Sequence, residues 1–413
     1  MKYIYDIVIR LYFCSIYLAQ FFNQKAKLWI KGRKNIWQKI SQVTKKENQK
    51  NIWIHVSSLG EFEQGRPVIE AIKKNINNVK IILTFFSPSG YEIRKNYAFA
   101  DYIFYLPLDT KKNVKKFYSF IKPDVVIFVK YDFWYNYLNE AHKQNIPLIL
   151  ISATFKQQSI FFKPYGRFFK NMLNYFTKIF VQDENSQKLL HKINIDSEIS
   201  GDTRCDRVIE IAQNANLPDK ILNIINNKMV IVVGSAWKKD IKIIKKTINY
   251  FKDILWIIAP HNIEKQNIDK IIQLLNKKVI KYSEIVNNQE FEGNILIIDN
   301  IGMLASLYKT AYIAYVGGGF GKGIHNILEP AVYGIPVIFG PNFIKFNEAV
   351  DLIKLKAAFT VKNETEAFNI FKMLITDQEL RNICEKNAKN YVIEKAGATN
   401  IIVNYLNQSF LSR

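Results

Sequence analysis

Residues 53–72, WIHVSSLGEFEQGRPVIEAI, have the pattern of a β-strand followed directly by an α-helix. The apolar residues at the start suit a buried strand, the SSLG segment interrupts it, and helix-forming residues follow. Glu61 lies in the turn between them. A carboxylate there can cap the free N–H groups of the helix, or it can serve chemistry, because ligands of open α/β sheets gather at the carboxyl ends of strands. These residues alone leave both interpretations of Glu61 open.

The same alternation of strand and helix continues along the chain in two series, one from residue 51 to about 200 and one from about 228 onward. The strand-like segments are NIWIHV, KIILTFF, DVVIFV, IPLILIS and KIFVQD in the first series, and KMVIVVGS, ILWIIAP, NILIID, AYIAYVGGG and GIPVIFG in the second. Their continuous apolar character is typical of parallel sheets that are covered on both faces. The sequence therefore predicts an α/β fold with two Rossmann-like domains facing a cleft.

Length and charge limit the classes of function. A chain of 413 residues is long enough for two domains, and 48% hydrophobic residues indicate a folded protein. The net charge of +22 favours an anionic partner, such as nucleic acid, an acidic membrane surface or a phosphorylated substrate. A general enrichment in Ile, Asn and Lys is the competing explanation for this charge. No nucleic-acid-binding motif is present, so no nucleic-acid partner is expected.

The cysteines and histidines do not predict a metal site. The three cysteines have no metal-ligand spacing and form no even disulfide framework, which fits a reducing compartment. The five histidines include no HxxxH pair.

The N-terminal segment, residues 4–22, is mostly apolar but contains Asp6 and Arg10. Its uncharged part is shorter than the roughly 20 residues that a spanning helix needs. Cations at residues 25–34 follow it, which places the next domain on the cytoplasmic side. We expect a helix that lies on a membrane surface or spans it marginally, and the alternative is a first helix buried against its own domain. An aromatic segment at residues 160–176 could also touch lipid, or it could be an amphipathic core helix.

Residues 315–341, YVGGGFGKGIHNILEPAVYGIPVIFGP, form the strongest local signal for a ligand. The glycines let the backbone approach a phosphate closely, and a helix N-terminus offers free N–H donors to it. Asn326 is expected to start a helix that runs through Glu329, whose carboxylate could accept hydrogen bonds from ribose hydroxyls. The pattern is neither a Walker A nor a GxGxxG motif.

Three other loops at the carboxyl ends of strands in the second series would complete a nucleotide-sized site. They contribute Ser235 and Lys238, then Pro260 and His261, and then Ile301, Gly302 and Met303.

Seven blocks in this order resemble a known family. They are the apolar segment followed by KAKLWIKGRKN, then HVSSLGEFEQGRPVI, SPSGYEI, FWYNYL, GDTRCDRV, APHNIEK and GGGFGKGIHNILEPA. Together they resemble the 3-deoxy-D-manno-octulosonic acid (Kdo) transferases of lipopolysaccharide synthesis, which are GT-B glycosyltransferases. The resemblance covers nearly the whole chain, and the SLGE and HNILEP blocks are its most specific parts.

This resemblance implies an inverting, metal-independent enzyme that moves Kdo from CMP-Kdo to the lipid A precursor, lipid IVA, without a cofactor. It also implies a location on the cytoplasmic face of the inner membrane and contact with its anionic surface. A GT-B glycosyltransferase with another nucleotide sugar and lipid-linked acceptor stays open as an alternative, and a non-enzymatic nucleic-acid-binding protein is a remote one.

The resemblance also implies roles for particular residues. Glu61 matches the general base, and Asp132 and Arg204 match the transition-state stabilisers. CMP contacts fall on Pro260, His261, Ile301–Met303, Asn326, Ile327, Leu328 and Glu329. Our reading of the loops adds to the donor site Ser235, Lys238, Gly318, Gly319 and His325, and no residue is expected to bind a metal.

The chain departs from the family pattern in three places. VKYDFWYN has Lys130 and Asp132 where many members carry two glutamates. APHN lacks the arginine that usually precedes the histidine, and GSAWKKD replaces a more typical Ser-Thr-His. Lys238 and Arg204 could supply the missing positive charge.

The sequence predicts three parts of the chain. Residues 1–34 would form the membrane-associating helix and its basic flank, residues 35–208 the acceptor domain, and residues 209–413 the CMP-sugar donor domain. A terminal helix is expected from about Thr399, and it would either stay with the second domain or pack back on the first.

Overall fold

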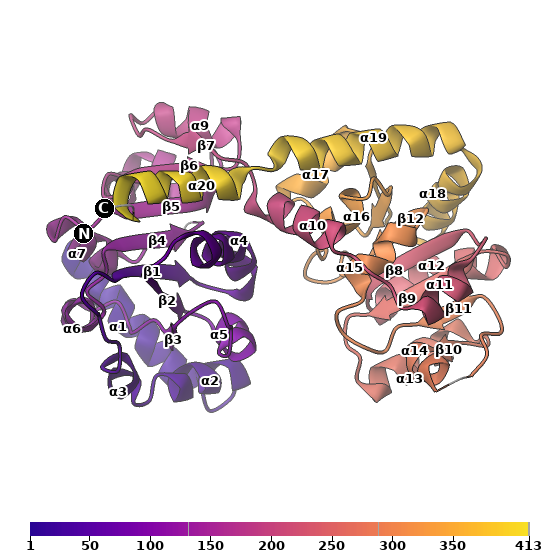
Figure 1. Cartoon of the computed structure of the whole chain (residues 1–413), viewed down its shortest axis with the longest axis horizontal. Coiled ribbons are helices and arrows are strands. Elements are labelled where there is room, and N and C mark those ends of the chain that lie inside the picture. The colour runs from indigo at the N-terminus through magenta and orange to yellow at the C-terminus, as the bar shows by residue number, and fades with distance from the viewer. Residues whose placement is uncertain (131, 288, 412–413) are drawn as a thin grey trace. The chain divides into compact units, whose positions relative to one another are not determined.

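The computed structural model describes residues 1–130, 132–287 and 289–411, and the chain forms two compact units (Figure 1). The first unit contains Met1–Asp206 and also Lys395–Arg413, and the second contains Arg207–Glu394. The chain therefore divides two residues before the expected boundary, and its last helix belongs to the first unit.

The first unit is built on a seven-stranded parallel sheet with the order β3-β2-β1-β4-β5-β6-β7. The strands are β1 (Lys50–Val56), β2 (Val79–Phe85), β3 (Tyr102–Tyr105), β4 (Val125–Val129), β5 (Leu148–Ala153), β6 (Lys178–Val181) and β7 (Glu198–Ile199). All five strands predicted for this half are confirmed. β3 and β7 at the two edges were not predicted.

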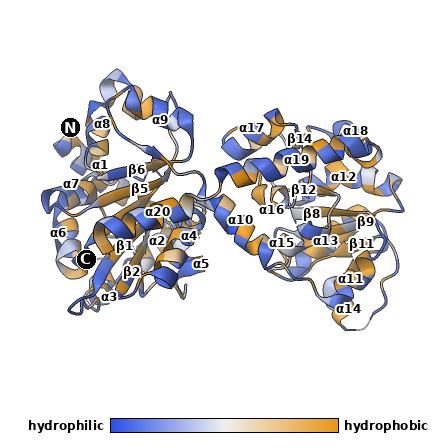
Figure 2. Cartoon of the chain, turned by 45° about the horizontal axis from the view of Figure 1, so that its top comes forward, coloured by the Kyte–Doolittle hydropathy of each residue, from blue (hydrophilic) through white to orange (hydrophobic). Residues whose placement is uncertain are grey.

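Helices cover both faces of this sheet, and alternate residues of a strand point to opposite faces. In β1, Trp53 joins one core cluster with Phe117 of α6 (Lys111–Ile121), whereas Ile54 joins the other with Ile402 of α20 (Ala398–Leu406). The helices of the unit are α1 (Lys2–Ala19), α2 (Gln24–Gly32), α3 (Ile36–Ile40), α4 (Leu59–Asn75), α5 (Pro88–Arg94), α6 (Lys111–Ile121), α7 (Tyr135–Lys143), α8 (Arg167–Leu173), α9 (Glu184–His191), α10 (Thr203–Gln213, which continues into the second unit) and α20 (Ala398–Leu406). Figure 2 shows the hydrophobic strands at the centre and the helices with one polar face.

The second unit repeats this architecture with the order β10-β11-β9-β8-β12-β13-β14, again fully parallel. Its strands are β8 (Val230–Ala236), β9 (Leu255–Pro260), β10 (Ile280–Lys281), β11 (Ile295–Ile297), β12 (Ile313–Val316), β13 (Val337–Phe339) and β14 (Ala358–Thr360). Its helices are α11 (Asp219–Ile225), α12 (Lys238–Tyr250), α13 (Lys265–Leu275), α14 (Tyr282–Val286), α15 (Leu304–Leu307), α16 (Leu328–Ala331), α17 (Asn347–Lys354), α18 (Glu364–Thr376) and α19 (Gln378–Lys395). The five strands predicted here are also confirmed.

Both sheets have a topological switch point, where the strand order reverses direction. It lies between β1 and β4 in the first unit and between β8 and β12 in the second. In open α/β sheets the loops at the carboxyl ends of these neighbouring strands diverge and leave room for a ligand. The loops after β1 and β4 carry Glu61 and Asp132, and the loop after β12 carries the glycine-rich segment.

The N-terminal helix α1 is only partly attached to the first unit. Ile9 is its one buried residue, and Tyr5 donates a hydrogen bond of 2.6 Å to buried Asp109. Most of its other large apolar side chains are exposed. Within the described residues no single helix has the length and apolar character to cross a membrane, although α1 and α2 together, bent by 118°, would meet that test.

One expectation about a lipid-facing segment needs correction, and the structure favours one of the two interpretations of another segment. Arg33 is not part of a free basic flank, because its guanidinium lies 3.6 Å from the Trp29 ring centroid and donates to the carbonyls of Leu106 and Phe86. Burial lowers the pKa of Arg33 to about 9. The aromatic segment at residues 160–176 belongs largely to the core, where its apolar side chains pack against the same cluster as Trp53.

Candidate functional site

Glu61 lies in the first turn of α4, directly beyond the carboxyl end of β1. Its Oε2 accepts a hydrogen bond from the backbone N–H of Ser57, so the side chain does cap the helix start. The capping interpretation is therefore correct as far as it goes. It does not account for the electrostatics of the carboxyl group.

Burial raises the pKa of Glu61 to about 7, and the negative charge of Asp132 adds to the shift. The N–H groups of Ser57 and Ser58 and the charge of Lys130 act in the opposite direction and are outweighed. The effect of desolvation on the pKa of Glu61 is thus larger than the opposite effect of the helix N-terminus. A carboxyl group with a pKa near 7 can exchange a proton efficiently at neutral pH.

Asp132 follows β4, the neighbour of β1, and its carboxylate is held by the first unit itself. His55 Nε2 and Trp134 Nε1 each lie 2.8 Å from Asp132 Oδ2. His55 is fully buried and was not identified as a site residue from the sequence. The strand position of His55, six residues before Glu61 in a resembling block, was the available signal.

Arg204 lies in the first turn of α10 and forms a close ion pair with buried Asp202, at 2.7 Å between Nη2 and Oδ2. The charge of Arg204 lowers the pKa of Asp202 against the effect of burial. Lys130 lowers the pKa of both Asp202 and Glu61, so its charge is felt on both sides of this site. Glu61, Asp132 and Arg204 therefore lie at the carboxyl-end edge of the same sheet. Lys130 is close enough to influence both Glu61 and the Asp202 partner of Arg204.

The second unit has a cavity of about 620 Å³ at its own switch point, between the loops that follow β8 and β12. The predicted donor residues among its described lining are Lys238, Gly318 and His325. The rest of the described lining is Ala236 at the end of β8, Trp237, Lys239 and Asp240 at the start of α12, Asn262, Asn267 and Ile271, and Phe320–Gly323 of the glycine-rich loop.

Three rings are stacked at this cavity. The ring centroids of Trp237 and His261 are 4.4 Å apart, and those of His261 and His325 are 4.3 Å apart. Trp237 Nε1 lies 3.1 Å from His325 Nε2. Because an indole N–H can only donate, His325 Nε2 accepts, and the proton of neutral His325 is on Nδ1. Burial, together with the nearby His261, lowers the pKa of His325 to about 4, so the ring is neutral at pH 7.

Asp240 fixes the walls of the cavity to one another. Its carboxylate accepts hydrogen bonds from the backbone N–H groups of Trp237 and Gly318 at 2.9 and 3.1 Å, and from the Tyr315 hydroxyl at 2.9 Å. Sequence reasoning missed Asp240 because two of its three partners, Tyr315 and Gly318, are 75 and 78 residues away.

The other predicted donor residues are outside the described lining of this cavity. Ser235, Pro260 and Ile301–Met303 lie at or beyond the carboxyl ends of β8, β9 and β11. The helix expected at Asn326 begins at Leu328 and is one turn long, and the Asn326 side chain accepts from the Leu328 N–H at 3.2 Å. Asn326 also donates to Glu329 Oε1 at 3.1 Å, so Asn326–Glu329 form one local cluster.

Gly319 has a structural reason to be glycine. A Cβ atom at this position would lie 2.6 Å from the Cα of Gly340, so the β12 and β13 loops could not approach each other as they do. Gly318 has a positive φ of 94°, and a Cβ there would lie 2.5 Å from the Gly323 carbonyl oxygen and 3.0 Å from the His325 ring. Gly318 thus permits the ring stack, whereas Gly319 permits the packing of two loops.

Comparisons with known proteins agree with this architecture. Residues 34–207 match the family model described as 3-Deoxy-D-manno-octulosonic-acid transferase (kdotransferase). A 3-deoxy-D-manno-octulosonic acid transferase from Aquifex aeolicus is 29% identical over 354 residues, with 83% of this chain and 92% of the relative covered. The corresponding transferase from Haemophilus influenzae is 25% identical, with 86% of each chain covered.

A longer relative shares the same region. The bifunctional glycosyltransferase/methyltransferase of Fusobacterium nucleatum is 27% identical over 388 residues, and the match covers 89% of this chain but 59% of that protein. Among solved structures, UDP-GlcNAc 2-epimerase from Neisseria meningitidis superposes with a TM-score of 0.61 at 18% identity, over 87% of this chain and all of that one. MurG from Acinetobacter baumannii gives 0.57 at 12% identity, over 87% and 99%. At these identities the structural likeness concerns the fold.

Two Rossmann-like units with these relatives define a glycosyltransferase of the GT-B fold. Its sequence is similar to the 3-deoxy-D-manno-octulosonic acid transferase family, through the model match at residues 34–207 and through relatives that cover most of the chain.

Proposed function

We propose that this protein transfers Kdo from CMP-Kdo to the lipid A precursor, lipid IVA, with inversion at the anomeric carbon and without a metal ion. The observation that carries the proposal is the match to a Kdo transferase over 92% of that relative's length. The switch-point sites of the two units support it, because one presents a proton acceptor and the other a basic cavity of nucleotide size.

In the proposed reaction Glu61 takes the proton from a sugar hydroxyl of the acceptor. The hydroxyl oxygen forms a bond to the anomeric carbon of Kdo while the bond from that carbon to the CMP phosphate oxygen breaks. The electron pair of the broken bond leaves with CMP, and Arg204 stabilises the negative charge that develops there. Because CMP is a good leaving group, this step does not require a metal ion.

We assign the donor nucleotide to the cavity of the second unit. Lys238 and Lys239 begin α12, where the free N–H groups of a helix start also favour a phosphate. His325 is neutral there and would offer its Nδ1–H as a hydrogen-bond donor. Glu329 is assigned to the ribose hydroxyls together with Asn326.

Replacing Trp237 with Phe tests this donor site. Phe keeps an aromatic ring against His261 but removes the N–H that holds His325 in one tautomer. We expect CMP affinity to fall about 2- to 10-fold, the effect of one hydrogen bond of about 0.5–1.5 kcal/mol. In ¹⁵N spectra of the free protein at pH 7, His325 should change from Nδ1-protonated to a mixture of tautomers.

Tyr250→Phe, at an exposed ring in the same unit, is the matched control and should leave both readings unchanged. An unaltered tautomer in Trp237→Phe would mean that the indole does not set the state of His325. Unaltered CMP affinity would remove the ring stack from the donor site.

The acceptor side is proposed to lie in the first unit. A cavity of about 590 Å³ there is lined by Asp132 and by aromatic side chains that include Phe133, Trp134 and Phe161. Such a surface suits the apolar part of a lipid beside a carboxylate that can meet its sugar hydroxyls.

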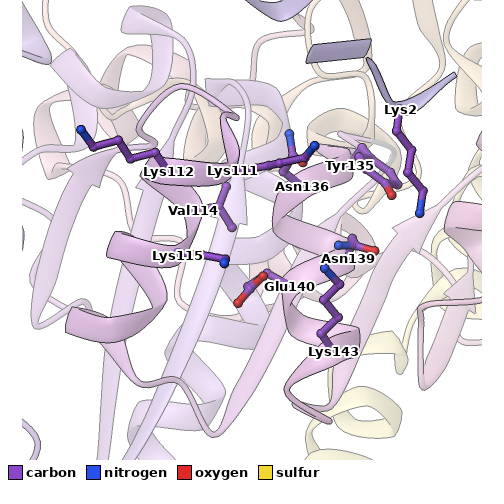
Figure 3. Close-up of a pocket in the computed structure, with 10 residues that line it drawn as sticks. All are labelled: Lys2, Lys111, Lys112, Val114, Lys115, Tyr135, Asn136, Asn139, Glu140 and Lys143. Atoms are coloured by element: carbon purple, nitrogen blue, oxygen red, sulfur yellow. The ribbon is translucent and has the colours of Figure 1, made fainter. Parts of the chain in front are cut away.

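We also propose that the protein works on the cytoplasmic face of the inner membrane, attached through α1. One side of α1 exposes a row of apolar residues, and a basic pocket of about 540 Å³ lies where the helix starts. Figure 3 shows this pocket, with side chains from α1, α6 and α7 around it. Its described lining contains Lys2, Lys111, Lys112, Lys115 and Lys143 but one acidic residue, Glu140. Cations near an anionic surface contribute roughly 1 kcal/mol each.

The membrane proposal is tested by Ile4→Gln, Ile7→Gln and Leu11→Gln together. These side chains are between 56% and 61% exposed, so their replacement leaves the Tyr5–Asp109 contact intact. Removing them should shift the protein from the membrane fraction to the soluble fraction, because each apolar side chain loses about 1.5–3 kcal/mol of burial in lipid. Fractionation followed by immunoblotting measures this shift.

The control carries Leu222→Gln, Ile383→Gln and Ile393→Gln, three exposed apolar residues of the second unit. Equal fractionation of the two triple variants would contradict attachment through α1. Turnover of a detergent-dispersed acceptor should survive in both, since the candidate catalytic residues lie after residue 50.

One departure from the family pattern favours a second candidate function, the transfer of a sugar from another nucleotide donor. GSAWKKD in place of a Ser-Thr-His segment would also suit a GT-B enzyme with another nucleotide sugar. Acceptor-dependent release of CMP from CMP-Kdo, with CMP and UDP as competing inhibitors, separates the two. CMP release that CMP inhibits and UDP does not supports Kdo transfer. No CMP release by a folded protein that binds UDP supports the alternative.

A further inference from the structure

A chain of hydrogen bonds connects the core of the first unit to Asp132. Trp53 Nε1 donates to Thr84 Oγ1 at 2.8 Å, and Thr84 Oγ1 lies 2.9 Å from His55 Nδ1. His55 Nε2 lies 2.8 Å from Asp132 Oδ2, which also accepts from Trp134 Nε1 at 2.8 Å. Trp53, Thr84 and His55 have no exposed surface, whereas the Asp132 side chain is 20% exposed. This series of hydrogen bonds therefore connects the buried interior of the unit to the edge of the site.

The direction of each proton in this chain follows from the groups themselves. An indole N–H only donates, so Thr84 Oγ1 accepts from Trp53 and must place its own proton elsewhere. The two candidate acceptors are His55 Nδ1 at 2.9 Å and the Ile54 carbonyl at 3.5 Å, and the shorter contact is the better hydrogen bond. The carboxylate of Asp132 can only accept, so His55 donates from Nε2, and its Nδ1 is the acceptor for Thr84. The Nε2–H of His55 thus points at the carboxylate of Asp132.

The result is an asymmetric carboxylate. Oδ2 of Asp132 receives two N–H donors, from His55 and Trp134, and both are charge-assisted hydrogen bonds. Neither donor reaches Oδ1, so Oδ1 keeps its lone pairs for a ligand.

We propose that His55 is a positioning residue for sugar transfer: in its Nε2–H form it fixes Asp132 so that Oδ1 meets the reacting sugar. This inference rests on the proposed function, since the substrate is the sugar that Glu61 activates. The fixed negative charge of Asp132 has a second effect, because it helps to hold the pKa of nearby Glu61 near 7.

The test compares His55→Gln with His55→Met. The two side chains have nearly the same length, but only Gln has an amide that can donate to Asp132. We expect His55→Met to lower kcat on the order of 10- to 100-fold, the factor for one hydrogen bond to a charged group. His55→Gln should recover most of this loss. KM for CMP-Kdo should change little in either variant, because CMP is assigned to the second unit.

The pH dependence of kcat/KM distinguishes a positioning role of His55 from a role in packing alone, because the loss of packing would not move its acid limb. When Asp132 is no longer held, its charge acts less on Glu61, so the acid limb of kcat/KM in His55→Met should move to lower pH than in the wild type. In an Asp132→Ala background the Gln and Met variants should be equal, because the partner of the donor is gone. Equal kcat of Gln and Met with Asp132 present, or an acid limb that stays in place, would overturn the proposal.

A spectroscopic measurement keeps the proposal independent of turnover and of the variants' folding. The ¹⁵N shifts of His55 in the wild-type protein should show a proton on Nε2 and none on Nδ1 at pH 7. A proton on Nδ1 would overturn the proposal even if Kdo transfer is found. An Nε2–H form without any Kdo transfer would leave the positioning of Asp132 standing and would refute the proposed reaction instead.

Discussion

Glu61→Gln should lower kcat by about 10²- to 10⁴-fold, the contribution of a well-placed general base. The amide keeps the shape of the side chain, and its carbonyl oxygen can still accept from the Ser57 N–H, so the helix cap is preserved. The melting temperature and CMP affinity should therefore stay close to those of the wild type. Steady-state kinetics, thermal unfolding and CMP titration measure the three quantities.

Glu63→Gln is the matched control, two residues further along the same helix, and it should retain near-normal turnover. Its carboxylate pairs with Arg94 at 2.7 Å and has no assigned part in the reaction. If Glu61→Gln keeps turnover within a few-fold of wild type, Glu61 is a helix cap and the proposed mechanism is wrong.

The pH dependence of kcat/KM of the wild-type enzyme should report the ionisation of Glu61. Glu61 must be ionised to accept a proton, and its pKa is raised to about 7. The value of kcat/KM should thus fall about tenfold per pH unit well below pH 7 and level off above it. Glu61→Gln should lose this acid limb. A wild-type limb with its midpoint near pH 4.5 would show that burial does not control this carboxyl group.

Arg204→Ala should have two separable effects. Turnover should fall on the order of 10²- to 10³-fold, as expected when a group that stabilises developing negative charge is removed. The free energy of unfolding should also decrease, by about 3 kcal/mol, because buried Asp202 loses its ion-pair partner. Lys130 remains close enough to influence Asp202, which places the loss at the low end of the range for broken buried pairs.

The double variant Asp202→Asn with Arg204→Ala separates these effects. It removes the unpaired carboxylate, so stability should largely return while turnover stays low. Denaturant unfolding and steady-state kinetics on the same preparations give both readings. Recovery of turnover in the double variant would make Arg204 a structural residue only.

The main strands could be predicted because they are long apolar runs between turn residues. The four strands that the sequence did not reveal are the edge strands β3, β7, β10 and β14, with four, two, two and three residues. Segments this short have no periodicity to detect, and their pairing depends on the neighbouring strand. Right-handed crossovers limit the strand orders open to such βα series, but the order itself was not predicted from the sequence.

The candidate site was only partly predictable. Glu61 and the glycine-rich loop stand out because strand ends and glycines have local signatures. His55, Asp240 and Trp237 carry none, since their roles arise from contacts with residues 77, 78 and 88 positions away. The sequence also could not decide the pKa of Glu61, because burial and the helix start act in opposite directions and the balance depends on three-dimensional packing.

The central claim is the transfer of Kdo to a lipid A precursor, and mass spectrometry of the lipid products tests it most directly. The full-length protein would be incubated with CMP-Kdo and detergent-dispersed lipid IVA, with Glu61→Gln and Glu63→Gln in parallel. We predict that the wild type and Glu63→Gln increase the mass of the lipid by whole Kdo residues, while Glu61→Gln leaves nearly all of it unmodified. An unmodified lipid with the wild-type protein, under conditions in which that protein is folded and binds CMP, would contradict the account.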